Sequence, residues 1–216
     1  MRESLQTWLE TLADEADADF QVRNDVRDRA LHQSRMLIRH CSQTIRAGHR
    51  NAWDEAEQLL GEASAEARQL QEMLAPYPEL YHAGYTQDAL KEWVEARLTL
   101  ALLGERALPA PEEMDVPYST FLNGLCEAAS ELRRRCLDVM RRGEMAEAER
   151  LLATMDAVYE VLMGFGYPNA ITGGLRRRVD QLRGVLERTR GDLTNSQQMQ
   201  QLADALAEFE RSFGAT

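Results

Sequence analysis

Lysine is almost absent from this chain of 216 residues: of its 25 Lys and Arg residues, 24 are arginine and Lys91 is the single lysine. Acidic residues number 36, so the formal net charge is −11 and the pI is about 4.9. This balance excludes a globally basic nucleic-acid coat but not a local basic surface, because charge acts where it is placed. The arginine bias itself fits either a GC-rich genome or the use of guanidinium forks to bind phosphate.

Long apolar runs are also missing. No stretch approaches the roughly 20 apolar residues that a membrane-spanning helix needs, and the acidic N-terminus, MRESLQTWLETLADEADADF, has no apolar signal core. The three cysteines form no CxxC pair and leave an odd number. We therefore expect a cytoplasmic protein in which Cys41, Cys126 and Cys136 are reduced core thiols.

Several catalytic signatures are absent as well. The sequence contains no nucleophile elbow, no glycine-rich phosphate loop and no cysteine and histidine spacing that suits zinc. A di-iron bundle normally needs Glu-x-x-His pairs on two helices. The four histidines lie outside any such pair, which argues against that type of centre; they are His32, His40, His49 and His82.

Helical periodicity dominates what remains. Apolar residues recur at spacings of three and four, and all six prolines fall in 75–83, in 108–118 or at Pro168. The pattern predicts an all-α fold, one domain over residues 1–216, with seven main helices after a short leader helix. The predicted helices cover residues 4–17, 22–49, 53–75, 85–104, 118–142, 145–164, 170–190 and 196–213.

Three helix boundaries have a physical rationale in the sequence. Gly48 and Gly143 each follow a turn that bears arginine, which is typical of a helix that stops in the left-handed conformation. The Thr-Asn-Ser run at 194–196 is expected to cap the last helix.

Charge is segregated along the chain. Residues 21–50 carry a net charge of +5, whereas residues 51–120 carry −10. In the basic segment, cationic residues at helical spacing stack along one face. This row is either a solvated face or a stripe that follows a nucleic-acid backbone and releases counterions. Its members are His32, Arg35, Arg39, Arg46 and Arg50.

Two of the predicted helices, 85–104 and 118–142, each carry a glutamate pair on a narrow polar line. If these lines face each other, four carboxylates converge, and they repel one another unless a proton or a cation neutralises them. Oxygen ligands of this kind suit a hard divalent cation such as Mg²⁺ or Mn²⁺. Solvated glutamate faces produce the same spacing, so the pattern alone leaves both interpretations open. The glutamates are Glu92, Glu95, Glu127 and Glu131.

Four segments, in the same order, resemble the translin/TRAX superfamily. Its long first helix resembles residues 27–50, RDRALHQSRMLIRHCSQTIRAGHR. Its two central segments resemble 87–96, QDALKEWVEA, and 121–144, FLNGLCEAASELRRRCLDVMRRGE. The C-terminal signature of archaeal and bacterial members is similar to 167–194, YPNAITGGLRRRVDQLRGVLERTRGDLT. The resemblance covers about residues 22–194 and omits the leader, 1–20, and the final segment, 195–216.

This resemblance implies a seven-helix subunit that assembles into a hollow, usually octameric particle with single-stranded RNA or DNA on its inner surface. Translin-type subunits bind, and TRAX-type subunits also cleave RNA with acidic residues and Mg²⁺. The TRAX pattern is E-x-x-E followed by G-x-x-D-x-x-x-E-L. Here KEWVEA supplies Glu92 and Glu95, and GLCEAASEL supplies Glu127, in place of the usual Asp, and Glu131. The chain therefore resembles the TRAX type more closely.

The implied function is a metal-dependent endoribonuclease that cleaves single-stranded or structured RNA inside a homo-oligomer. In the roles that the resemblance implies, Glu92, Glu95 and Glu127 bind Mg²⁺ or Mn²⁺, and Glu131 is a further ligand or the base that orients the attacking water. The candidate nucleic-acid contacts are Arg35, Arg39, Arg46, Arg133, Arg134, Arg176 and Arg177. The alternatives are a non-catalytic particle for single-stranded RNA or DNA, and a purely structural helical assembly.

Overall fold

The computed structural model describes the backbone of residues 2–214 and the side chains of residues 4–212. All regular elements in this range are helices, six of them long and three of a single turn, which confirms the predicted all-α class. The long helices are α1 (Arg2–His49), α2 (Trp53–Leu74), α4 (Gly84–Leu103), α6 (Tyr118–Arg141), α7 (Met145–Met163) and α9 (Leu175–Gly214). The short ones are α3 (Pro78–Tyr81), α5 (Pro111–Met114) and α8 (Asn169–Thr172).

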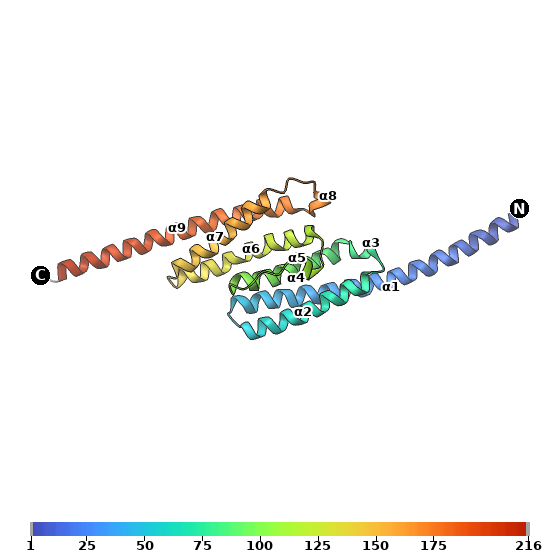
Figure 1. The fold of residues 1–216 in the computed structure, drawn as a ribbon, viewed down its shortest axis with the longest axis horizontal. Helices are drawn as coiled ribbons and strands as arrows, with labels where there is room; N and C mark the ends of the chain where they lie inside the picture. Colours follow the sequence, from blue (N-terminus) through green and yellow to red (C-terminus); the bar gives the residue numbers. More distant parts are fainter. Residues whose placement is uncertain (1, 215–216) are drawn as a thin grey trace.

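Helices α4 and α6 form the centre of the bundle. They pack against each other, with α1 and α2 against α4, and α7 and α9 against α6 (Figure 1). Helix α4 is apolar over most of its circumference, and its buried residues include Leu90, Trp93 and Val94. A helix that is apolar on most sides is expected in the middle of a bundle. Polar side chains on α4 and α6 are therefore held by a closely packed core.

Gly124 allows α4 and α6 to approach closely. A Cβ atom at this position would lie 2.7 Å from Val94 Cγ1 and 3.0 Å from the backbone oxygen of Lys91. Any larger residue would push the two helices apart, since such distances are shorter than van der Waals contact allows. About one turn further along α6, Glu127 accepts a hydrogen bond from Lys91 of α4.

Two predicted helix breaks are wrong. Residues 4–17 and 22–49 form the single helix α1, since no Gly or Pro lies between them and Arg23 pairs with Asp19 one turn away at 2.7 Å. The predicted break between residues 190 and 196 is also absent, because both of these residues lie within α9. The observed break comes earlier, between the short α8 and the long α9. Thr194 does not cap a helix, because it lies inside α9 and its Oγ1 donates to the Arg190 carbonyl oxygen at 2.9 Å.

The two predicted glycine stops have different outcomes. Gly143 follows α6 with φ +76°, which confirms the left-handed helix end. Gly48, in contrast, is helical and buried inside α1, where it packs against Leu100 of α4. The left-handed residue after α1 is Asn51, with φ 59°.

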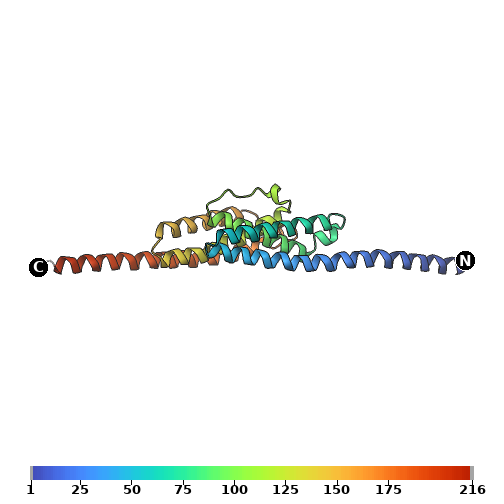
Figure 2. The ribbon, with the colours of Figure 1, turned by 90° about the horizontal axis from the view of Figure 1, so that it is seen from below.

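The two longest helices extend beyond the bundle in opposite directions (Figures 1 and 2). The projecting part of α1 carries exposed apolar side chains at 5, 8, 9 and 12, and the projecting part of α9 carries them at 199, 202, 206 and 209. In the described part of the chain, no helix is both long and apolar enough to cross a membrane. The three cysteines are buried and free, as predicted.

Candidate metal and nucleic-acid site

Three of the four predicted glutamates converge between α4 and α6. One carboxylate oxygen from each of Glu92, Glu95 and Glu127 lies within 4.8 Å of the others. Among residues 4–212, this is the one group of three or more His, Cys, Asp or Glu side chains with such spacing. Glu95 is buried, with 8% of its surface exposed, whereas Glu92 and Glu127 are partly open to solvent.

Lys91, the single lysine of the chain, lies among these carboxylates. It is 6% exposed, and its Nζ donates hydrogen bonds to Glu92 Oε1 at 2.8 Å and to Glu127 Oε2. Burial lowers the pKa of Lys91, but the hydrogen bonds to Glu127 and Glu92 outweigh burial and raise that pKa overall. The side chain is therefore an ammonium ion at neutral pH.

Arg178 of α9 holds the other oxygen of Glu127. Its Nε donates to Glu127 Oε1 at 2.7 Å, and its NH1 donates to Asn123 Oδ1 at 3.1 Å and to the Gly173 carbonyl oxygen at 3.2 Å. Burial raises the pKa of Glu127, but the hydrogen bonds from Lys91 and Arg178 outweigh it and lower the pKa. Glu127 is thus a carboxylate anion fixed on both oxygens.

Glu95 has the opposite electrostatic balance. Burial is the main cause that raises its pKa, and the negative charges of Glu92 and Glu127 raise it further, to about 9. The ammonium of Lys91 offsets only part of this effect. At neutral pH the third carboxyl group therefore holds a proton, unless another cation reaches it.

Glu131 lies one turn further along α6 and has a different partner. Its Oε2 is 3.0 Å from Nε2 of His49, the last residue of α1. The His49 side chain is only 1% exposed, and its Nδ1 is buried without a hydrogen-bond partner. The tautomer with its hydrogen on Nε2 fits these contacts, because Nε2–H donates to Glu131. Nδ1 then carries no hydrogen that would need an acceptor. The structure thus groups three glutamates and pairs the fourth with a histidine.

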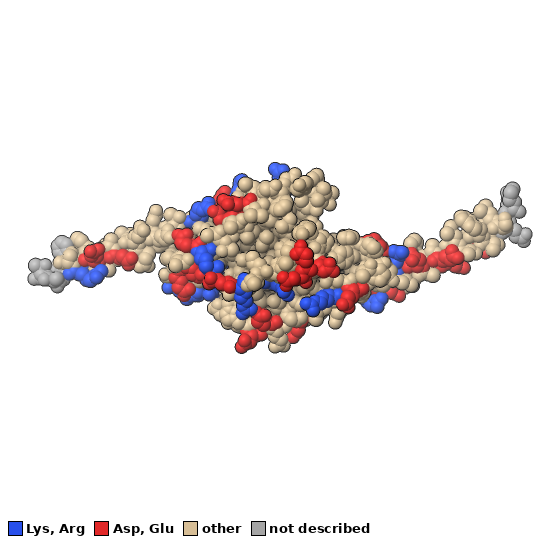
Figure 3. Space-filling model, viewed as in Figure 1, with Lys and Arg blue, Asp and Glu red and all other residues tan. Residues whose placement is uncertain are grey.

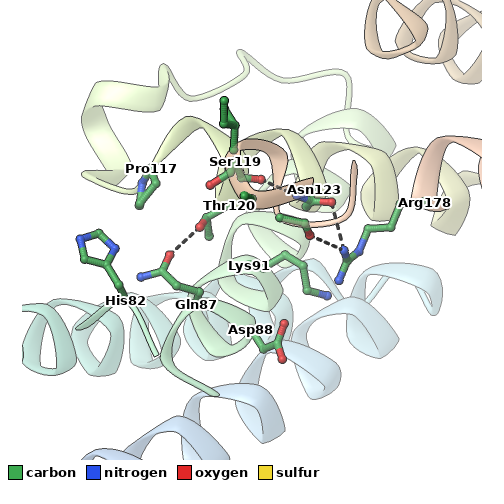
Figure 4. A pocket seen from close by; sticks show the side chains of 12 residues that line it. His82, Gln87, Asp88, Lys91, Pro117, Ser119, Thr120, Asn123 and Arg178 are labelled. Carbon is green, nitrogen blue, oxygen red and sulfur yellow. Dashed lines mark hydrogen bonds between the residues drawn. The ribbon is translucent and has the colours of Figure 1, made fainter. Parts of the chain in front are cut away.

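A cleft of about 440 Å³ opens beside the three carboxylates. Its lining includes Lys91, Asn123 and Arg178. Lys91 and Arg178 bind Glu127, and Asn123 accepts a hydrogen bond from Arg178. Figure 4 shows Lys91 and Arg178 at one end of the cleft and His82 and Gln87 at the other. The cleft borders the carboxylate group, because the two cations that line it, Lys91 and Arg178, both bind Glu127, and Asp88 adds one acidic side chain to the lining.

The predicted arginine contacts divide into exposed and engaged residues. The exposed ones lie on α1, on α6 and at the start of α9: Arg35, Arg39, Arg46, Arg134, Arg176 and Arg177. Arg133 is partly buried and donates to Thr189 Oγ1 at 2.9 Å and to Asp192 Oδ2 at 2.8 Å, so it ties α6 to α9. Acidic and basic side chains are interspersed over the face shown in Figure 3.

Three residues at the site are absent from the predicted set. Lys91 precedes Glu92 and lies four residues before Glu95, so its place on the same helix face is readable from the sequence. Arg178 is the third residue of the RRR run, and helix rotation alone does not show which of the three turns inward. His49 reaches Glu131 across 82 residues of sequence, a contact that only the tertiary fold reveals.

The comparisons with known proteins are consistent in sequence and fold. No protein-family model matches the chain. The chain is 33% identical over 190 residues to the uncharacterized protein MJ0175 of Methanocaldococcus jannaschii, a match that covers 87% of this chain and 84% of the relative.

The similar solved structures are C3PO proteins. The crystal structure of AfC3PO matches with a TM-score of 0.78 and 31% identity over 85% of this chain and 96% of that chain. AfC3PO in complex with duplex RNA gives a TM-score of 0.73 over 85% of this chain and 95% of that one, also at 31% identity. Apo-NeC3PO gives 0.76 at 21% identity, over 85% of this chain and 96% of that one, and supports the fold alone. The predicted superfamily is confirmed: this chain belongs to the translin family that includes the C3PO proteins.

Proposed function

We propose that this chain is a divalent-metal-dependent endoribonuclease of the TRAX type, which acts on single-stranded or structured RNA as a homo-oligomeric particle. The observation that carries the proposal is the convergence of one carboxylate oxygen from each of Glu92, Glu95 and Glu127 within 4.8 Å, next to a cleft that Lys91 and Arg178 line. RNA as the ligand is supported by the AfC3PO structure, which was solved with duplex RNA.

The residues present fit a hard divalent cation. Three carboxylate oxygens at this spacing match the oxygen ligands and small ligand number that proteins offer to Mg²⁺ or Mn²⁺. The raised pKa of Glu95 supports the same assignment, since two cationic side chains serve three acids and the third lacks a full charge partner. When bound, the ion would polarise the scissile phosphate and lower the pKa of a bound water.

The side chains around the ligands have separate roles in this proposal. Arg178 fixes Glu127, so one ligand oxygen is preoriented. Glu131, with a side chain that is 38% exposed, accepts the proton of the attacking water, and His49 orients its carboxylate. The exposed arginines of α1, together with Arg134, Arg176 and Arg177, bind the RNA backbone at a distance from the reaction.

A second candidate function has one observation in its favour. Lys91 already contacts two of the three carboxylates, an arrangement that also suits a stable ion-pair cluster without metal. In that case the chain is a non-catalytic particle that binds single-stranded RNA or DNA.

One experiment separates the two functions. Labelled single-stranded RNA is incubated with the purified protein in Mg²⁺ and in EDTA, beside a Glu92→Gln/Glu95→Gln variant. The matched control is Glu208→Gln/Glu210→Gln, which removes the same charge from exposed positions on the projecting part of α9. The nuclease proposal requires cleavage that depends on Mg²⁺, persists in the control and disappears in the site variant while RNA binding remains. Binding without cleavage in the unmodified protein supports the second candidate, and elution as a 24.5 kDa monomer contradicts the particle.

A further inference from the structure

We propose that Lys91 is a resident cation of the carboxylate site, which competes with a divalent ion for Glu92 and Glu127 and turns into the adjacent cleft when the ion binds. The inference rests on the proposed function, because it takes the three carboxylates as the metal site. It adds a role for a residue that supplies no ligand atom to the metal.

The competition follows from the contacts of Lys91. Its Nζ donates to Glu92 Oε1 and Glu127 Oε2, so the ammonium already contacts two of the three acids. A divalent ion bound by the three carboxylates would lie within a few ångströms of the Lys91 ammonium. Two like charges at that separation in a largely buried site repel strongly. One of the two cations therefore leaves when the other binds.

Lys91 is the side chain that can leave. Its ammonium sits on a flexible four-carbon stem, and its hydrogen bonds go to the two carboxylates. It also lines the cleft of about 440 Å³, which gives the ammonium space to turn into. In the cleft it lies at the same end as Arg178, and the acidic Asp88, which also lines the cleft, offers the ammonium a carboxylate there (Figure 4).

Arg178 differs in the way it is held. Besides Glu127, its guanidinium binds Asn123 and the Gly173 backbone carbonyl. Asn123 is itself fixed, since its Nδ2 donates to the Ser119 and Thr172 carbonyl oxygens at 2.7 Å each. Arg178 therefore positions Glu127, whereas Lys91 occupies space that the metal needs. The two cations carry the same charge next to the same carboxylate, yet only the removal of Lys91 should tighten metal binding.

The first test measures Mn²⁺ affinity by calorimetry without RNA. Lys91→Met should bind Mn²⁺ on the order of tenfold more tightly than the unmodified protein, because a competing charge-assisted contact is lost. Arg178→Met, which removes the same charge, should bind equally or less tightly. Lys91→Arg keeps a competing cation and should show no gain. If Lys91→Met and Arg178→Met tighten binding to the same extent, the effect is general electrostatics and the inference is wrong.

The second test uses the single lysine as a reporter. Because Lys91 is the only side-chain amine in the sequence, an amine-directed reagent reports on this residue and on the α-amino group, which serves as the internal standard. Modification of Lys91, followed by peptide mass spectrometry, should rise several-fold on addition of Mg²⁺ relative to EDTA. An unchanged reactivity in saturating Mg²⁺ contradicts the movement of the ammonium.

The two proposals fail in different ways. If the unmodified protein and Glu95→Gln both fail to bind Mn²⁺, the metal site itself is wrong and the proposed nuclease function fails with it. If the unmodified protein binds Mn²⁺ and Glu95→Gln binds it more weakly, but Lys91→Met gives no gain, only the competition is wrong. Thermal melts of each variant identify a loss of fold, and Lys91→Gln then replaces Lys91→Met.

Discussion

Glu127 and Glu131 lie one turn apart on the same helix and meet different partners. Glu127 is held on both oxygens by two cationic side chains, Lys91 and Arg178. Glu131 bonds the imidazole of His49 and leaves more of its side chain in contact with solvent. The first arrangement favours a fixed anion, which suits a ligand, and the second leaves an oxygen accessible for proton exchange. The same residue type therefore acquires two chemistries from the helices packed opposite it.

The largest expected contrast is in stability. Glu127→Gln leaves two partly buried cations without their shared anion, and we expect it to lower the free energy of unfolding by about 2–3 kcal/mol. Glu131→Gln preserves an oxygen that can accept from His49, so the loss should stay below about 1 kcal/mol. Urea unfolding of both variants measures the difference. Equal losses would mean that the two glutamates are held alike.

The buried Glu95 should make stability depend on pH. Its pKa is raised from about 4.5 in the unfolded chain to about 9 in the folded protein, so the folded state binds more protons between these values. The contribution of Glu95 to stability is therefore complete below about pH 4.5 and is lost as the pH rises toward 9. Glu95→Gln removes this loss, and in EDTA it should be more stable than the unmodified protein at pH 8, by up to roughly 5 kcal/mol, and by much less at pH 5. Thermal melts across this pH range measure the sign of the stability difference between Glu95→Gln and the unmodified protein. That sign at pH 8 reverses if Glu95 is a stabilising carboxylate anion in the folded protein.

Removal of the histidine sharpens the comparison on the Glu131 side. His49→Leu fills similar space but leaves Glu131 without its hydrogen bond, so we expect cleavage to fall about tenfold while the Mn²⁺ affinity of the three carboxylates stays the same. His49→Gln, which can donate to Glu131, should restore part of the rate. A fall in Mn²⁺ affinity in His49→Leu would place Glu131 among the metal ligands.

The smallest expected effects concern the arginines. Arg35 and Arg39 are exposed, whereas Arg133 is partly buried and hydrogen-bonded, so the two classes differ as Glu131 and Glu127 do. In the double variant Arg35→Gln/Arg39→Gln, each substitution should make the plot of log RNA affinity against log salt concentration less steep by about 0.7–0.9. Arg133→Gln should leave this slope unchanged, since Arg133 is bonded to Thr189 and Asp192, and should instead cost about 1 kcal/mol of stability. Binding titrations at several salt concentrations distinguish the two classes.

Local patterns in the sequence predict the fold class and the glutamate pairs because both depend on helical periodicity. The spacing of Glu92 and Glu95, and the position of Glu127, are properties of single helices. The partners of these residues are not, since Arg178 meets Glu127 across 51 residues and His49 meets Glu131 across 82. The missed continuity of α1 has a local cause: residues 17–22, DADFQV, interrupt the apolar periodicity but include no residue that breaks a helix.

Gly124 connects the packing of the core with the size of ion that the site can hold. The separation of α4 and α6 depends on a residue without a side chain, and the same separation sets how far Glu127 stands from Glu92 and Glu95. Mg²⁺ requires oxygens at about 2.0–2.1 Å, whereas Ca²⁺ accepts about 2.3–2.6 Å and a looser shell. Discrimination between small and large divalent ions would therefore be determined at the helix crossing, by a residue that contacts neither ion.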